Sequence, residues 1–512
     1  MHCATPSHEA SARFAGDVTS ESLRGRSLRS GAVTVANQAA RFALRMVATM
    51  VLARLLTPGD FGVVAMVGSL VGFVGMFREF GLSMAIVQKP TLSAAELNAV
   101  FWVNLLLGAV VSLLLFAAAP AVAAFYGRPE TLAITRAFAG MGLVGSLGTQ
   151  HYALLQRWMR FGAIAGRDLL ASTVGLIAGI LAALAGAGFW SLVIMEAAGT
   201  VAGTGFLWWR AGWLPGLPRP ASGVRELLQF GGAMTLSNLL TYANHNLDNV
   251  LLGRFLGETA VGFYSRAQGL LNRPLEQVLP PIMNVATPLL SRLAPDAPRF
   301  RRAALRLTEL VCFGGCFLAV VIIPAADWIV RLVLGPQWMA AVPVFRVLSV
   351  FSLLEPLAWI LGLVLITYGR PGAMATWRAV TFGVVAVAFL GGMRWGVVGV
   401  AAGYMLSGVA TRIWLVFFVG RRVGIAVRDF VAACLPFVAV AGAVAGGLVL
   451  LRQVWDPGHP VWGLAAVTAA AAVLYPAGLV CIPRSRRFVA YLLSVMQDAA
   501  RAGVRRPFKP AR

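Results

Sequence analysis

Two arginines inside the first long apolar stretch of the chain are its strongest candidates for binding chemistry. Gln38, Arg41 and Arg45 recur at helical spacing within residues 31–52, so they share one helix face. A charged side chain near the bilayer centre costs about 2.5–3.5 kcal/mol unless it faces water, an anion or a partner. Guanidinium groups bind phosphate oxygens in pairs. The pattern predicts an anion site, and the alternative is that both arginines extend to the cytosolic interface.

A second polar stripe lies within residues 227–252. Its members recur at helical spacing and are Asn238, Tyr242, His245 and Asn249. A shift of 200 residues brings Gln38 onto Asn238 and Arg45 onto His245, so the two stripes fall at matching depth. Amide, phenol and imidazole groups offer the donors and acceptors that sugar hydroxyls need. We expect a sugar-binding face, and the alternative is a hydrogen-bond network that holds neighbouring helices together.

One acid adjoins this second stripe. Asp248 is open to two interpretations, because it could pair with Arg45 or bind a coupling ion, H⁺ or Na⁺. Three other acids, Glu196, Asp327 and Glu355, look isolated, and we expect them to lie at helix ends.

The segment 259–285 supplies a second pair of candidate anion ligands. Arg266 and Arg273 are seven residues apart and therefore share a helix face. Three prolines, at positions 274, 280 and 281, are expected to break or kink this helix. Such interrupted helices are common in transporter gates.

The composition indicates that these residues lie in a membrane protein. Of the 512 residues, 59% are hydrophobic and only 12% are charged, and the mean hydropathy is +0.77. A soluble domain is typically about 45–50% apolar and about 25% charged. The composition excludes an ordinary soluble enzyme, a disordered chain and a secreted disulfide scaffold. It predicts an all-α protein that crosses the membrane many times.

Apolar segments of about 20 residues, long enough to cross a bilayer, recur along the chain. We expect about fourteen transmembrane helices, near residues 31–52, 60–87, 98–124, 131–153, 169–186, 189–209, 227–252, 259–285, 308–330, 340–366, 372–391, 395–418, 429–451 and 460–482. The connections between them are too short to hold a folded extramembrane domain.

The basic residues are distributed unequally between the two sides of this map. With the N-terminus in the cytosol, 29 Lys and Arg fall on the cytosolic side and 7 on the other. Cytosolic loops of membrane proteins are enriched in Lys and Arg. The asymmetry predicts that both termini are cytosolic. It also accounts for most of the net charge of +23 without any nucleic-acid partner.

An internal repeat relates the two halves of the chain. The stretch Leu52–Leu56 matches Leu252–Leu256, and each is followed six residues later by a glycine, Gly62 or Gly262. Because the offset is an even number of spans, both copies have the same orientation in the membrane. Such parallel repeats are typical of two-lobed transporters that work by alternating access.

The repeat and the charge map together predict the domain organisation. We expect a disordered cytosolic tail (1–29), an N-terminal six-helix lobe (30–210), a cytosolic linker (211–226), a C-terminal six-helix lobe (227–420), two additional transmembrane helices (421–483) and a basic cytosolic tail (484–512).

The chain carries no motif for nucleotide-driven or hydrolytic chemistry. A P-loop, a GxSxG nucleophile elbow and an HExxH zinc motif are all absent from the sequence. Cys312 and Cys316 share a helix face, but no histidine or further cysteine joins them at metal-ligand spacing. We therefore expect no metal, no cofactor and no enzymatic activity.

Several of these stretches resemble a known family. The runs Leu52–Gly62, Phe80–Gln88, Asn246–Gly257 and Gly262–Ser265 are similar to Wzx-type polysaccharide flippases. These belong to the multidrug/oligosaccharidyl-lipid/polysaccharide exporter superfamily, and the resemblance is to its colanic-acid-exporter-like branch. It covers about residues 28–420.

The resemblance implies a bacterial inner-membrane protein with two six-helix lobes and two extra C-terminal helices. It implies a substrate, an undecaprenyl-pyrophosphate-linked oligosaccharide, that moves from the cytosolic to the periplasmic leaflet. Membrane lipid and the polysaccharide polymerase or export machinery would be its partners. The arginine pattern of related lipid II flippases does not align with this chain, so our site hypothesis rests on the polar stripes.

That hypothesis divides the substrate between two sets of residues. We expect the pyrophosphate to be bound by Arg41 and Arg45 together with Arg266 or Arg273. We expect the sugar to contact Gln38, Asn238, Tyr242, His245 and Asn249.

Two alternative functions remain open at the level of sequence. A cation-coupled multidrug exporter of the same superfamily would share the body plan, but it would need an acidic central cavity. An integral-membrane glycosyltransferase or polymerase would need catalytic carboxylates in sizeable outer loops, and the loops here are short.

Overall fold

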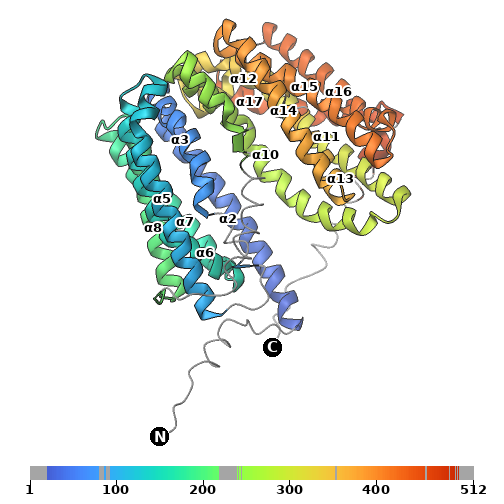
Figure 1. Cartoon of the computed structure of the whole chain (residues 1–512). Coiled ribbons are helices and arrows are strands. Elements are labelled where there is room, and N and C mark those ends of the chain that lie inside the picture. The colour runs from blue at the N-terminus through green and yellow to red at the C-terminus, as the bar shows by residue number, and fades with distance from the viewer. Residues whose placement is uncertain are drawn as a thin grey trace, which may run out of the picture. The chain divides into compact units, whose positions relative to one another are not determined.

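The computed structural model describes residues 20–79, 86–87, 93–217, 239, 242–243, 245–351, 354–455, 458–483, 485–490, 492 and 494, with the side chains of the first helix described from residue 37. Within these ranges the regular secondary structure is all helical and contains no strand, which confirms the all-α prediction. Figure 1 shows the helices in chain order.

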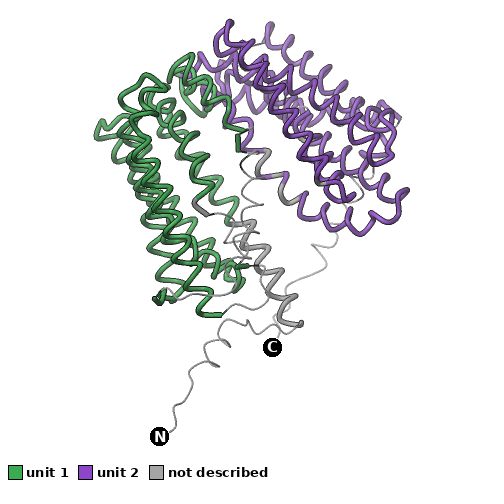
Figure 2. The backbone as a smooth tube through the Cα atoms, viewed as in Figure 1, with its two compact units in different colours: residues 1–265, 333–337 green, residues 266–332, 338–512 purple. Residues whose placement is uncertain are grey.

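The helices fall into two compact units, which are coloured separately in Figure 2. The first comprises residues 1–265 and 333–337, and the second comprises residues 266–332 and 338–512. The chain therefore passes between the units inside one helix, at residues 265 and 266, and again on either side of the short segment 333–337.

The first unit begins with six long helices. They are α2 (Ser20–Leu55), α3 (Pro58–Glu79), α5 (Ala94–Tyr126), α6 (Glu130–Arg157), α7 (Phe161–Leu184) and α8 (Trp190–Ala211). Helical residues 245–256 and the start of α10 (Glu258–Leu293) complete it. Because α2 begins at Ser20, residues 20–29 of the expected tail are helical.

The second unit contains the rest of α10 and the helices that follow it. These are α11 (Ala297–Val333), η1 (Pro336–Ala341), α12 (Val342–Phe351), α13 (Glu355–Thr367), α14 (Pro371–Gly392), η2 (Met393–Trp395), α15 (Gly396–Val423), α16 (Val427–Val454) and α17 (Pro460–Val480). Its buried core joins α11, α13 and α15 to α16 and α17.

Nine helices of the described residues are long and apolar enough to cross a membrane. Fourteen spans thus stay a prediction, while a multi-pass membrane protein is established. The helices α2 and α10 are not among the nine, and each carries arginines within its length. These are the two helices on which the sequence places the candidate pyrophosphate ligands.

Local sequence determines where several helices begin and end. Ser93 caps α5 by accepting a hydrogen bond from the Glu96 backbone amide, and the Glu96 carboxylate accepts one from the Ser93 amide. Gly127 ends the same helix with a left-handed φ of 66°. At the start of α3, the Asp60 carboxylate accepts hydrogen bonds from the backbone amide and hydroxyl of Thr57.

The structure departs from the expected spans at one place. The segment 340–366 was expected to be one helix, but α12 ends at Phe351 and α13 begins at Glu355. Periodicity alone misses this difference, because both halves of the segment are apolar. The expected span 259–285 lies within one helix, since α10 runs from Glu258 to Leu293. Its prolines therefore do not break it, and a kink stays a prediction.

The repeat corresponds to a reciprocal helix crossing in the first unit. A Cβ atom added at Gly62 would overlap the backbone carbonyl of Glu258, and one added at Gly262 would overlap that of Pro58. The shift of 200 residues exchanges these two contacts. The starts of α3 and α10 therefore cross with local two-fold symmetry, and only glycine permits backbones to approach so closely.

Candidate functional site

A cluster of two arginines and one aspartate joins α2 to α7 in the first unit. Arg41 Nη1 lies 2.7 Å from Asp168 Oδ2, and Arg167 Nη1 lies 3.0 Å from Asp168 Oδ1. Asp168 thus places one carboxylate oxygen against each guanidinium. We call these three residues the arginine–aspartate cluster.

The charges of this cluster do not balance. Two guanidiniums and one carboxylate leave one positive charge in excess. The Asp168 side chain is 8% exposed, whereas those of Arg41 and Arg167 are 32% and 31% exposed. The acid is therefore enclosed, and each arginine keeps an accessible face. Such an arrangement attracts an anion.

Several polar atoms at this cluster are buried without a hydrogen-bond partner. They are the Nε atoms of Arg41 and Arg167, and Oδ1 of Asn37, which lies one turn before Arg41. Buried donors are normally satisfied by protein, water or ligand. Both Nε–H groups are enclosed by protein and have no hydrogen-bond acceptor, so a ligand would meet the more exposed parts of these two side chains.

Helix α8 packs against the Arg167 side chain of the cluster. A Cβ atom added at Gly203 would lie 2.9 Å from Arg167 Nε and 3.2 Å from its Cζ. The absence of a side chain at Gly203 therefore leaves the space that the Arg167 guanidinium occupies. Since α7 and α8 pack along their length, α8 positions this arginine.

The remaining residues of the first polar stripe flank the cluster on α2. Gln38 is half-buried, and Arg45 is exposed one turn beyond Arg41. Among the described residues the Arg45 side chain has no ion pair, while its carbonyl accepts a hydrogen bond of 2.8 Å from the Thr49 hydroxyl. The stripe thus continues as a basic face on α2.

The residues of the second stripe differ in their exposure and hydrogen bonding. The Tyr242 hydroxyl donates a hydrogen bond of 3.2 Å to the Gly68 carbonyl of α3, and it fills the space beside Gly72. Tyr242 therefore makes the interhelical bond that the structural alternative expected. His245 is exposed and remains accessible to a ligand.

Two further residues of this helix have buried polar atoms. Asp248 is 2% exposed, and one of its carboxylate oxygens accepts a hydrogen bond of 2.7 Å from the backbone amide of Asn249. The side-chain oxygen of Asn249 is buried without a partner. Asn238 lies outside the described residues.

The predicted pyrophosphate ligands are divided between the two units. Arg41 and Arg45 belong to the first unit, whereas Arg266 and Arg273 follow the boundary in α10 and belong to the second. Both α10 arginines are half-buried. Their joint action with Arg41 on one ligand stays a prediction.

Sequence reasoning missed Asp168 and Arg167. The span was expected to begin at residue 169, which placed both residues in a cytosolic loop, but α7 begins at Phe161. A signal was present, because an arginine within an apolar helix needs a counter-charge. The identity of that counter-charge depends on how α2 and α7 pack.

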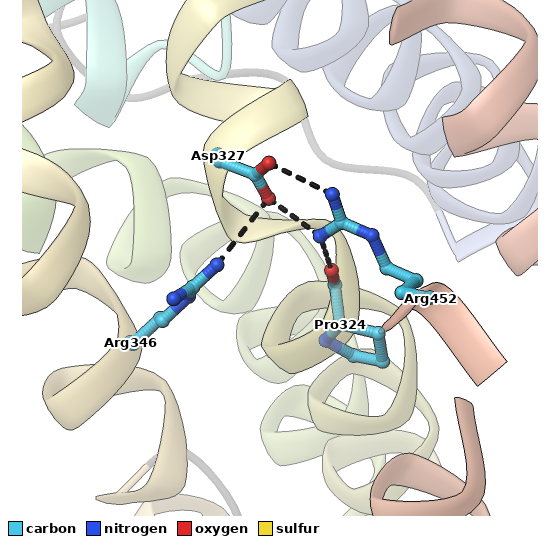
Figure 3. A network of polar contacts seen from close by, with 4 residues as sticks. All are labelled: Pro324, Asp327, Arg346 and Arg452. Carbon is cyan, nitrogen blue, oxygen red and sulfur yellow. Dashed lines mark hydrogen bonds and ion pairs between the residues drawn. The ribbon is translucent and has the colours of Figure 1, made fainter. Parts of the chain in front are cut away.

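The second unit pairs an acid that sequence reasoning left isolated. Asp327 of α11 accepts two hydrogen bonds, of 2.6 and 2.8 Å, from Arg452 of α16, and Arg346 of α12 approaches within 3.6 Å. Figure 3 shows this network, in which Arg452 also donates to the Pro324 carbonyl. The expectation of an isolated acid is wrong, because three helices bring these charges together.

Glu355 is likewise paired, with Arg412 of α15, at 2.5 Å. Its expected position at a helix end holds, since it occupies the first turn of α13.

A contact between two cysteines links α11 to α16. Cys312 Sγ lies 3.5 Å from Cys434 Sγ, which joins α11 to α16, while Cys312 and Cys316 are both buried. Over the part of the chain that is described, no three His, Cys, Asp or Glu residues form a metal-binding group.

The chain is similar to proteins of bacterial polysaccharide synthesis. A family model described as "Polysaccharide biosynthesis protein" matches residues 51–343. The teichuronic acid biosynthesis protein TuaB of Bacillus subtilis is 26% identical over 317 residues, or 60% of this chain and 64% of TuaB. The lipopolysaccharide biosynthesis protein WzxC of Escherichia coli is 25% identical, over 77% of this chain and 81% of WzxC.

A third relative is the succinoglycan biosynthesis transport protein ExoT of Rhizobium meliloti. It is 26% identical over 71% of this chain and 75% of its own length.

Solved structures show the same fold. The lipid II flippase MurJ in an inward closed conformation aligns with a TM-score of 0.71 at 11% identity, over 89% of this chain and 99% of that one. An inward-facing multidrug transporter of the MATE family aligns with a TM-score of 0.55 at 14% identity, over 77% of this chain and 94% of that one.

Proposed function

The chain belongs to the polysaccharide biosynthesis protein family, whose model matches more than half of its length, and on this premise we propose that it is a flippase. Its substrate is an oligosaccharide linked to undecaprenyl pyrophosphate, which it moves from the cytosolic to the periplasmic leaflet of the inner membrane. Both termini lie in the cytosol. Three relatives named for polysaccharide synthesis or transport support this assignment.

The observation that carries the proposal is the arginine–aspartate cluster. A pyrophosphate and a hydrated sugar cannot enter hydrocarbon unaided, because their water would have to be removed without replacement. The excess positive charge of Arg41, Arg167 and Asp168 replaces that water for the pyrophosphate. The polyprenyl chain can remain in the lipid throughout.

The rest of the site follows from the two polar stripes. Arg45, with Arg266 or Arg273, completes the contacts to pyrophosphate. The sugar contacts Gln38, Asn238, Tyr242, His245 and Asn249. Movement of the two lobes about the site then opens it to one leaflet at a time. Asp248 is a candidate for a coupling H⁺ or Na⁺, and the polymerase or export machinery receives the product.

The excess positive charge also argues against a cation-coupled drug exporter. A cationic drug would be repelled by a cluster whose accessible groups are two guanidiniums. An acidic pocket would be needed instead. The basic cluster therefore favours an anionic substrate.

The decisive experiment follows the lipid-linked sugars in a strain that lacks the gene. Complete repeat units should accumulate on the cytosolic leaflet, and polymer should be lost. Re-expression of the full chain should restore export, whereas Arg41→Ala should restore less than a tenth of it at equal membrane abundance. Arg210→Ala, at the exposed end of α8, is the matched control and should restore export fully.

Other outcomes would assign the protein elsewhere. Truncated lipid-linked units would indicate a failed sugar-transfer step, and hence an enzyme. An unchanged lipid pool with increased sensitivity to cationic drugs would indicate the drug exporter. Full export by Arg41→Ala would remove the arginine–aspartate cluster from the substrate path.

A further inference from the structure

We propose that Arg331 and Arg346, two exposed arginines beside the Asp327–Arg452 ion pair, bind the phosphate group of a lipid. The site lies at one end of the second unit, where α11 and α16 end and α12 begins. It is separate from the arginine–aspartate cluster, which belongs to the first unit. A polyprenyl carrier as the lipid rests on the proposed function, but the binding of phosphate does not.

The first observation is the position of these side chains along their helices. Arg331 and Arg452 each lie two residues before the end of their helix, and Arg346 lies four residues after the start of α12. At 1.5 Å per residue, all three are within about 6 Å of a helix end. Both α11 and α16 are long and apolar enough to cross a membrane. The three guanidiniums are therefore at the level of lipid headgroups.

The second observation is that Arg452 is fixed by protein contacts. It donates hydrogen bonds of 2.6 and 2.8 Å to the two carboxylate oxygens of Asp327, and another to the Pro324 carbonyl (Figure 3). Its Cζ lies 3.8 Å from the centroid of the Trp328 ring, which fills the space beside Gly463 of α17. Arg452 thus holds the Asp327 carboxylate in place and is itself already occupied.

The third observation is that Arg346 is close to this pair without joining it closely. Its Nη2 lies 3.6 Å from Asp327 Oδ1, which is longer than a hydrogen bond, and its side chain is 53% exposed. Among the described residues this is its one ion pair. Figure 3 shows Arg346 and Arg452 approaching Asp327 from different sides. The N–H groups of Arg346 therefore remain available to a ligand.

The fourth observation places a second exposed guanidinium at the same point. Arg331 is one helical turn after Asp327, so the two side chains share a face of α11. Side chains of a helix lean towards its N-terminus, which directs Arg331 over the turn that carries Asp327. Arg331 is exposed and forms no ion pair within the described part of the chain. Arg331 and Arg346 can therefore reach one ligand.

The charges at this end indicate what that ligand is. Three guanidiniums face one carboxylate, because Asp327 is the only acid at this end of α11, α12 and α16 as described. Two positive charges are left in excess, which matches a phosphate dianion or a diphosphate. Guanidiniums bind phosphate oxygens in pairs, and a phosphate has enough oxygens for two of them. A neutral sugar would leave the excess charge uncompensated.

The predicted topology indicates which lipids can supply the phosphate. The distribution of basic residues predicts that this end of the second unit faces away from the cytosol. The ligand then belongs to the periplasmic leaflet. A polyprenyl diphosphate carrier that has crossed the membrane carries such a group, and so does an anionic phospholipid.

The first test measures binding of radiolabelled inorganic pyrophosphate to the purified full chain by equilibrium dialysis. Arg346→Ala should bind one pyrophosphate fewer per chain than the native protein, or bind it at least tenfold more weakly. Arg331→Ala should act in the same direction. The matched control is Arg394→Ala in η2, an exposed arginine on the same predicted side, which should bind as the native chain does.

Asp327→Asn separates a binding site from a purely structural ion network. Loss of the acid raises the excess positive charge, so this variant should bind pyrophosphate at least threefold more tightly. Unchanged affinity in Asp327→Asn would count against the site. If Arg346→Ala does not yield folded protein, Arg346→Lys keeps the charge and loses the planar donor group, and it should bind at least threefold more weakly.

Two results would overturn the phosphate site. One is native stoichiometry and affinity in both Arg331→Ala and Arg346→Ala. The other is an equal loss of binding in Arg394→Ala, which would show a general attraction of anions to surface charge. The site stands if binding depends on Arg331 and Arg346 and not on Arg394.

The second test identifies the lipid by competition in phosphatidylcholine nanodiscs. Displacement of pyrophosphate by a polyprenyl diphosphate at a concentration at least tenfold below that of phosphatidylglycerol would identify the carrier. Equal displacement by the two would identify a phospholipid headgroup, and displacement by neither would overturn the lipid assignment. If the strain that lacks the gene accumulates no lipid-linked units while binding still depends on Arg346, the proposed function fails and the phosphate site stands.

Discussion

Asp168 is the residue that most changes the interpretation of the site. The sequence patterns indicate no counter-charge at Asp168 for Arg41, but in the structure Arg41 and Arg167 both pair with Asp168. The carboxylate stabilises two guanidiniums within the helical bundle and leaves one positive charge for a ligand. A substrate pyrophosphate would therefore compete with Asp168 for the same Nη–H groups.

We predict that Asp168→Asn destabilises the empty protein and strengthens its response to anions. Two partly exposed arginines would lose their counter-charge, which should cost about 1–2 kcal/mol after solvent screening. Inorganic pyrophosphate should then raise the unfolding temperature of Asp168→Asn more than that of the native chain, because a ligand stabilises the state that it binds. Thermal unfolding monitored by size-exclusion chromatography measures both effects.

The matched control for this substitution is Asp296→Asn. Asp296 pairs with Arg299 at 3.2 Å, but both side chains are largely exposed, at 44% and 68%. Its loss should change the unfolding temperature little, with or without pyrophosphate. An equal response of the native chain and Asp168→Asn to pyrophosphate would refute competition at Asp168.

At the scale of the helix, the reciprocal crossing of α3 and α10 explains why the repeat is best preserved around residues 52–62 and 252–262. The paired glycines are needed because each faces the backbone of the other helix. Identical arginines or leucines at equivalent positions of two apolar helices can arise from composition alone. A glycine that faces a backbone carbonyl is instead required by the close packing of the two helices.

We predict that Gly62→Ala destabilises the protein by about 2 kcal/mol or more, because the added Cβ would overlap the Glu258 carbonyl. Gly262→Ala should have a similar effect. The double variant should cost less than the sum of the two, since both substitutions separate the same pair of helices.

Gly75→Ala provides the comparison within α3, because no atom lies within 4 Å of a Cβ at that position. It should be neutral or slightly stabilising. Yield and unfolding temperature of the purified protein measure all four variants. An unfolding temperature for Gly62→Ala equal to that of Gly75→Ala would exclude close backbone contact at the crossing.

At the scale of the whole molecule, the two C-terminal helices are part of the second unit's core. Phe430 and Phe437 of α16 and Tyr475 of α17 are buried with residues of α11. The Tyr475 ring stacks on Phe313 at 5.5 Å. Ion pairs join α16 to α11 near both ends, Arg301–Asp429 at one and Asp327–Arg452 at the other.

We predict that removal of residues 424–512 destabilises the second unit and spares the first. The truncation would expose the apolar side chains of α11 and α13 that α16 and α17 cover. Limited proteolysis should then cleave α11 to α15 faster, while α5 to α8 stay protected. Removal of residues 495–512 alone is the control, and equal protease resistance of the two truncations would contradict the prediction.

The sequence by itself determined the class, the family resemblance, the repeat and the basic face of α2. The length of apolar segments, the distribution of basic residues and helical periodicity are properties of the sequence itself, so they can be predicted without a structure. Only the tertiary structure decided which charges meet. Arg41 and Asp168 are 127 residues apart, and Arg412 and Glu355 are 57 apart. Their pairing depends on which helices pack together and at what rotation, and no local pattern encodes either.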